Sequence, residues 1–127
     1  MEAASAMIQI KRAYEASADA DGTRLLVERL WPRGIRKTDL VLNDWLKDVA
    51  PSQELRLWFH HAPALWPEFC LRYLAELEAK PQTWLPILQA ARKGTVTLIY
   101  SAHDTEHNSA LLLQQFLNQR LKLKHTG

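Results

Sequence analysis

The chain has few of the residues that stabilise small secreted domains or bind structural metals. It holds a single cysteine, Cys70, so an internal disulfide and a cysteine-rich zinc site are both excluded. No apolar run approaches the ~18 residues that a transmembrane helix needs. The amino terminus also lacks the positively charged and then apolar segments of a secretory signal. We therefore expect a cytoplasmic protein that does not enter membranes, with residues 1–6 as a disordered extension.

The sequence also lacks a large net charge. Sixteen Lys and Arg are balanced by fourteen Asp and Glu, and the resulting charge of +2 is too small to attract nucleic acid or membranes over the whole surface. An apolar fraction of 47% suits one core, so we expect residues 1–127 to form a single domain. The positive charge is concentrated locally, because Arg29, Arg33, Arg36 and Lys37 lie within nine positions.

Three segments have the pattern of β-strands. Residues 8–14 alternate apolar and polar side chains, as a half-exposed strand does. Residues 24–30 contain an uninterrupted apolar run, which suits a central strand covered on both faces. Residues 95–100 are β-branched and apolar. Between the first two strands, Asp21 and Gly22 predict a turn.

The long segment between the second and third strands has a helical pattern. A short helix is expected around Leu42, Trp45 and Leu46, another helix begins at Pro51, and later prolines separate the helices that follow. A last helix is predicted over residues 106–123. Because a long helical crossover joins parallel strands, we expect a small three-layer α/β domain with a short, mostly parallel sheet and a multi-helix crossover between the second and third strands.

The loop after the second strand has the residue types of an anion-binding site. Arg29 and Arg33 each offer a fork of donors that fits carboxylate or phosphate. Trp31 offers a flat face for stacking, and Gly34 permits a positive φ or a close approach of the backbone to a ligand. The alternative interpretation is that each arginine pairs with a nearby acid and that Trp31 packs in the core.

The loop after the third strand is expected to lie beside the first loop. Ligands of parallel sheets bind beyond the carboxyl ends of the strands, and the amides of a following helix favour an anion. Tyr100 is a second candidate for stacking, and Ser101, Asp104 and Asn108 are candidates for side-chain contacts with the ligand. The alternative is that Asp104 or Thr105 simply caps the helix.

Few side chains here are candidates for catalysis or metal binding. Glu28 and Asp104 are the weak candidates for a catalytic base, although Glu28 has the alternative role of orienting one of the arginines. His103 and His107 are four positions apart, but no sequence neighbour supplies a third ligand. We therefore predict no metal site, and nothing in the sequence indicates a cofactor.

Several segments of the chain form a recognisable set of motifs. They are Arg24-x-Leu26-Val27-x-Arg29-Leu30-Trp31-Pro32-Arg33-Gly34, Trp45, Ala50-Pro51-Ser52, Leu55-Arg56-x-Trp58-Phe59 and Val96-Thr97-Leu98-x-Tyr100-Ser101-Ala102-x-Asp104-x-x-x-Asn108. With these motifs the chain resembles the YeaO-like branch of the bacterial family known as domain of unknown function 488. The resemblance extends over residues 7–121 and implies a small cytosolic α/β protein whose activity is not established.

The same resemblance implies a loss of chemical groups. Longer relatives in the wider family carry a cysteine at the end of the last strand and a Cys-His-Arg triplet where the last helix begins. The matching positions here are Tyr100 and Asn108-Ser109-Ala110. The thiol and imidazole that could take part in a reaction are therefore absent, which favours binding over catalysis.

Three functions remain open at this point. The preferred one is binding of an anionic, phosphate-bearing small molecule or nucleotide between Arg29, Arg33 and the amides after Tyr100. The second is a hydrolase or transferase acting on a phosphate or N-glycosidic bond, with Asp104 or Glu28 as the base. The third and weakest is nucleic-acid binding, against which the low net charge argues. The sequence leaves open whether any reaction is catalysed and what the oligomeric state is.

Overall fold

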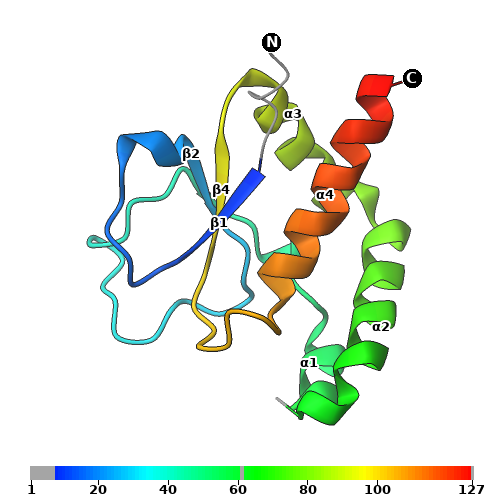
Figure 1. Ribbon diagram of the computed structural model, residues 1–127. Coiled ribbons are helices and arrows are strands. Elements are labelled where there is room, and N and C mark those ends of the chain that lie inside the picture. The colour runs from blue at the N-terminus through cyan, green and yellow to red at the C-terminus, as the bar shows by residue number, and fades with distance from the viewer. Residues whose placement is uncertain (1–7, 61, 127) are drawn as a thin grey trace.

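The protein folds around a parallel β-sheet with helices on one face (Figure 1). The computed structural model describes residues 8–60 and 62–126, of which 123–126 are described by their backbone alone, so the segment expected to be an extension lies outside the described residues. The strands pair in the order β1-β4-β2-β3, and every pair is parallel. Their bounds are Ile8–Arg12 for β1, Thr23–Leu26 for β2, Asp44–Trp45 for β3 and Val96–Tyr100 for β4.

Three of the described α-helices lie between β3 and β4 and form the crossover, and a fourth follows β4. Four α-helices are described: α1 (Gln53–Phe59), α2 (Trp66–Ala79), α3 (Leu85–Lys93) and α4 (Ser109–Thr126). Ser52 caps α1 by accepting a hydrogen bond from the Leu55 amide, and a proline occupies the first turn of both α2 and α3. The α/β class, the mostly parallel sheet and the multi-helix crossover that the sequence predicts are confirmed.

The two faces of the sheet are covered differently. Because side chains alternate along a strand, Leu98 and Leu25 pack under the helices, whereas Ile99 and Leu26 point to the opposite face. That second face is covered by irregular chain, and helices are confined to the first (Figure 1). The residues that pack there are Ala13, Leu26, Leu40 and Ile99, with Trp31, Ile35, Leu42 and Trp45 partly buried against them. The third layer is therefore made of loops.

The prediction of a short helix around Leu42, Trp45 and Leu46 is wrong. The segment instead forms β3, followed by a 3-10 helix over Lys47–Val49. The amide of Asn43 donates to the Arg24 carbonyl at 2.8 Å, and the amide of Leu46 donates to the Leu26 carbonyl at 2.8 Å. Three apolar residues in five positions fit a helix and a strand equally well, and pairing with β2 decided between them.

Two predicted boundaries also move. The second strand ends at Leu26 rather than residue 30, so Glu28 and Arg29 lie in a loop. The last helix begins at Ser109 rather than residue 106. Asn108 accepts a hydrogen bond from the Leu111 amide at 2.8 Å, as an N-cap residue does. Both shifts lengthen the loops at the carboxyl edge of the sheet.

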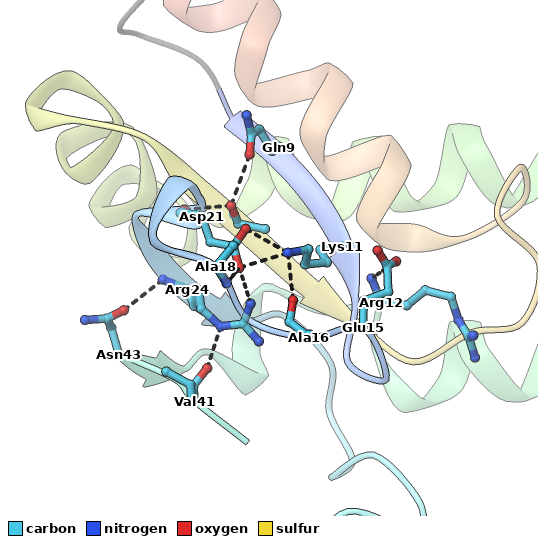
Figure 2. A network of polar contacts seen from close by, with 11 residues as sticks. Gln9, Lys11, Arg12, Glu15, Ala16, Ala18, Asp21, Arg24, Val41 and Asn43 are labelled. Carbon is cyan, nitrogen blue, oxygen red and sulfur yellow. Dashed lines mark hydrogen bonds and ion pairs between the residues drawn. The ribbon is translucent and has the colours of Figure 1, made fainter. Parts of the chain in front are cut away.

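A buried ionic network anchors the loop-covered face (Figure 2). Asp21 and Arg24 are only 4% and 3% exposed, and their side chains join through Nη1 and Oδ2 at 2.5 Å. Lys11 Nζ lies 2.9 Å from Asp21 Oδ1, and Thr97 Oγ1 donates to the Asp21 carbonyl at 2.7 Å. Arg24 Nε donates to the Val41 carbonyl at 2.7 Å. The network therefore ties β1, β2, β4 and two loops together.

Candidate functional site at the carboxyl edge of the sheet

The loops after β1, β2 and β4 meet at the carboxyl edge of the sheet. Glu28 accepts hydrogen bonds from the amide of Ser101 at 3.0 Å and from its hydroxyl at 2.6 Å. Arg12 donates to the carbonyls of Ser101 at 3.1 Å and Ala102 at 2.9 Å. Segments that are more than seventy residues apart in the sequence are thus in direct contact.

Arg12 is a site residue that the sequence reasoning did not single out. It ends β1 in register with Tyr100, and its guanidinium lies 4.9 Å from the ring centre of Tyr14. The Tyr14 hydroxyl donates to the backbone carbonyl of Arg33 at 2.8 Å, which ties the two arginine-bearing loops together. The available signal was its position, because the last residue of a parallel strand faces the same edge as the other strand ends.

The arginines of the second loop are not neutralised by carboxylates of the described residues. Arg29 is half-buried and donates to the carbonyls of Pro51 and Ala50, at 3.3 and 3.5 Å. The guanidinium of Arg33 is exposed and contacts no polar group within the described part of the chain. Of this group only Arg36 lies near an acid, with Nε 3.7 Å from the carboxylate of Asp39. Arg29 and Arg33 therefore form no ion pair within the described residues.

The two candidate bases are engaged by backbone amides. Glu28 holds Ser101, as described above, and does not orient an arginine. Asp104 accepts from the amides of Glu106 and His107, at 2.9 and 3.0 Å, and its other oxygen lies 3.0 Å from His107 Nδ1. These amide and imidazole contacts hold the pKa of Asp104 below its usual value. Asp104 shapes the loop, and Asn108, which donates to the Asp104 carbonyl at 2.9 Å, caps the helix.

Tyr100 ends β4 beneath this edge and is 4% exposed. Burial raises the pKa of its hydroxyl, the charge of Arg12 lowers it, and Glu15 and Glu28 raise it further. The hydroxyl therefore lies within electrostatic range of all three charged groups. Among the described residues it has no hydrogen-bond partner, which is unusual for a buried polar group and leaves it free to bind a ligand or a water molecule.

Two tryptophans flank the arginine-bearing loop. Trp31 and Trp45 are half-buried, with ring centres 5.3 Å apart in an edge-on arrangement. Trp31 Nε1 donates to the Ile35 carbonyl at 2.6 Å, and Trp45 Nε1 donates to the Glu28 carbonyl at 2.6 Å. Trp45 was interpreted from the sequence as helix packing, and its place on β3 brings it to the same edge as Glu28.

Gly34 shapes the loop by its backbone conformation. Its φ is +84°, a value that side-chain-bearing residues rarely adopt, and a Cβ built there would meet nothing within 4 Å. Of the two roles that the sequence suggests for Gly34, the positive φ is therefore the one seen.

The histidines and the cysteine do not form a reactive centre in the described part of the chain. His103 is exposed, whereas the ring of His107 packs edge-on against Trp66 with centres 5.2 Å apart. No group of three or more His, Cys, Asp or Glu among the described residues is arranged to hold a metal ion. Cys70 is half-buried in α2, and burial raises the pKa of its thiol, which makes it a poorer nucleophile.

The fold is that of a small parallel α/β protein, and the carboxyl edge of its sheet carries arginines together with two carboxylates that accept hydrogen bonds from backbone amides. The chain belongs to the family described as the inactive DUF488-N3 subclade, whose family model matches residues 7–127. The YeaO-like resemblance of the sequence is thereby confirmed.

The relatives of the chain are bacterial proteins of nearly the same length. It is 46% identical to the uncharacterized protein YeaO of Escherichia coli (strain K12) over 110 residues, which cover 87% of this chain and 96% of that protein. It is 39% identical to the uncharacterized protein Rv3073c of Mycobacterium tuberculosis (strain ATCC 25618 / H37Rv) over 113 residues, 89% of this chain and 95% of the relative. No solved structure matches the chain. None of the helices described here is both long and apolar enough to cross a membrane.

The contact between Glu28 and Ser101 gives a prediction about stability. We expect Glu28→Gln to lower the free energy of unfolding by about 1–3 kcal/mol, because an amide cannot accept from both donors of Ser101. Chemical denaturation followed by tryptophan fluorescence measures the loss. Glu106→Gln, an exposed carboxylate in the loop after β4, is the control and should change stability by less than ~0.5 kcal/mol. Equal effects of the two substitutions would contradict the assigned role of Glu28.

Proposed function

We propose that this chain is a non-catalytic binding protein for a phosphate-bearing small molecule at the carboxyl edge of its sheet. The observation that carries the proposal is that Arg12, at the end of β1, and Arg29 and Arg33, in the loop after β2, lie at this one edge, and no carboxylate of the described residues forms an ion pair with them. Arg12 and Arg29 are held by backbone carbonyls, which fix their positions without forming an ion pair. A phosphate would neutralise their charge and accept from the guanidinium forks.

Tyr100 and the rigid surroundings of the edge support the same proposal. Its unpartnered, buried hydroxyl is a hydrogen-bond donor that an oxyanion would satisfy. The loops that carry the arginines are braced by the Tyr14 and Glu28 hydrogen bonds, so little ordering is needed on binding. Ser101, Asp104 and Asn108 then act mainly as the frame of the site, while Arg29, Arg33 and Tyr100 contact the ligand.

The state of the two carboxylates favours binding over the hydrolase or transferase alternative. A general base must face the group whose proton it takes, whereas a carboxylate that accepts hydrogen bonds from loop amides is directed toward the loop that it holds. Glu28 already accepts two hydrogen bonds from Ser101, and Asp104 already accepts from two amides and His107. The description of the family as inactive agrees with this arrangement.

Calorimetric titration of the purified chain with inorganic phosphate and pyrophosphate tests the proposal. We expect pyrophosphate to bind, and Arg33→Gln to weaken its binding about tenfold to a hundredfold through loss of a charged, forked donor. Arg92→Gln is the matched control, because Arg92 is exposed on α3, just before the segment that enters β4 at the opposite edge. Absence of binding by the parent, or equal weakening in both variants, would refute the proposal.

A further inference from the structure

The two tryptophans at the carboxyl edge form a rigid aromatic platform beside the arginines. Each indole N–H is fixed by a backbone carbonyl, so neither ring is free to turn. The carbonyl that holds Trp45 is that of Glu28, whose carboxylate holds Ser101. Trp31 lies two residues before Arg33 in the same loop. The platform therefore adjoins the loop that carries Arg33 and contacts the backbone of Glu28.

The faces of these rings are covered by lysines. Lys47 Nζ lies 4.2 Å from the ring centre of Trp45. Lys37 Nζ lies 5.7 Å from the ring centre of Trp45 and 5.8 Å from that of Trp31. Both lysines are exposed, and neither pairs with an acid within the part of the chain that is described. The rings are thus approached by long, exposed side chains that no ion pair holds in place within the described residues.

The relative strengths of two contacts decide what such a surface favours. A lysine over an exposed indole contributes about a 2- to 5-fold preference. Stacking of a nucleobase on an aromatic side chain contributes about 5- to 150-fold per base. A planar base therefore displaces the ammonium group from the ring. The displaced lysine remains tethered beside the base, where it can pair with a phosphate.

We propose that the ligand of this edge is a nucleoside phosphate, whose base stacks on Trp45 while its phosphates contact the arginines and the displaced Lys37 or Lys47. This assignment rests on the proposed phosphate site and names the class of ligand that the site takes. Cations lie within reach of a phosphate on such a base, because Lys47 Nζ is 4.2 Å and Lys37 Nζ 5.7 Å from the ring centre of Trp45, and Lys37 belongs to the loop that carries Arg33. A bare phosphate would leave the aromatic platform unused.

Titration with pyrophosphate and with ADP, in the absence of divalent metal, separates the two proposals. We expect the parent to bind ADP about 5- to 150-fold more tightly than pyrophosphate, and ADP to quench tryptophan fluorescence. Trp45→Leu should remove the advantage of ADP, read as the ratio of the ADP and pyrophosphate affinities measured in the same variant. Trp58→Leu is the matched control, since Trp58 is also half-buried under a cation, with the Arg72 guanidinium 4.2 Å from its ring centre, but lies on α1.

Each outcome decides between the proposals. Equal affinities for ADP and pyrophosphate would overturn the nucleotide assignment and leave the phosphate site standing, whereas failure of both ligands to bind would remove the two together. An ADP advantage that survives Trp45→Leu would also overturn the assignment. If Trp45→Leu fails to fold, Lys37→Gln with Lys47→Gln keeps both rings, and should weaken ADP binding while leaving the quenching by saturating ADP in place. Absence of quenching in the parent at saturating ADP would refute stacking directly.

Discussion

Replacing Asp21 with asparagine should destabilise the protein by about 3–5 kcal/mol, the usual cost of removing one partner of a buried ion pair. Asp21 is the anion to which both Lys11 and Arg24 are bound, and Arg24 is 3% exposed. Without the carboxylate, two cations remain close together with little access to water. Chemical denaturation of parent and Asp21→Asn, followed by tryptophan fluorescence, measures the loss of unfolding free energy.

Two further variants test whether the loss of stability in Asp21→Asn comes from the unpaired buried cations. Asp39→Asn removes a carboxylate that is largely exposed beside an exposed Arg36, so its cost should not exceed ~1 kcal/mol. Adding Arg24→Met to Asp21→Asn should cost less than the sum of the single changes, because it removes one of the unpaired cations. A loss below about 1 kcal/mol for Asp21→Asn, or strict additivity with Arg24→Met, would show that the network contributes little to stability.

The same network predicts how the free energy of unfolding depends on pH. The hydrogen bond from Lys11 lowers the pKa of Asp21 below its ordinary value of 3.8; burial opposes this shift, and the contacts from Ala18 and Arg24 add to it. A carboxyl group whose pKa is lower in the folded state than in the unfolded state stabilises the protein at pH values above the unfolded-state pKa. That stabilisation is lost as the pH falls through the folded-state pKa. The stability difference between parent and Asp21→Asn should therefore be constant at neutral pH and narrow below pH 3.8. A difference that widens on acidification would contradict this sign.

We expect Gly22→Ala to destabilise the protein by about 2–5 kcal/mol, combining backbone strain with overpacking. The φ of Gly22 is +64°, and a Cβ placed there would lie 2.2 Å from the carbonyl oxygen of Thr95. The obstacle is backbone, and that same oxygen accepts the Thr23 amide at the start of β2. It cannot move aside without disturbing the pairing of β2 with β4. Thermal and chemical unfolding of the variant measure the cost.

Gly34→Ala is the matched control for this prediction. Gly34 also has a positive φ, but open space surrounds it, so only the strain of about 1–2 kcal/mol is expected. The difference between the two alanine variants therefore isolates the contact with Thr95. Equal losses at the two positions would show that the close approach at Gly22 is relieved by small shifts of the chain.

The sequence predicted the parts of the fold that local patterns encode. The alternation at residues 8–14 and the β-branched run at 95–100 gave β1 and β4, and the helical stripes gave the crossover. The pattern failed at Trp45, because two residues of an edge strand carry no periodicity of their own. It also failed at the start of α4, where a helix-like composition begins before the residue that caps the helix.

The sequence predicted that the loops after β2 and β4 meet, but it did not indicate all the residues that meet there. That the loops after β2 and β4 would meet follows from parallel strands whose carboxyl ends share an edge, and Glu28 does contact Ser101. The partner of Glu28 could not be read from the sequence, since an arginine neighbour in the chain is a plausible partner too. Arg12 and Trp45 join the edge only through the register of β1 and the pairing of β3.

What the sequence determined by itself is the class of fold and the concentration of cations after the second strand. These depend on residue type and short-range spacing, which the chain carries in any conformation. Only the tertiary structure decided which polar groups satisfy one another. It assigned Asp21 to the buried cations and Glu28 to Ser101, and left the arginines of the edge without carboxylate partners among the described residues. The physical reason is that hydrogen bonds and ion pairs depend on distance and direction between segments far apart in the chain, and local sequence contains neither.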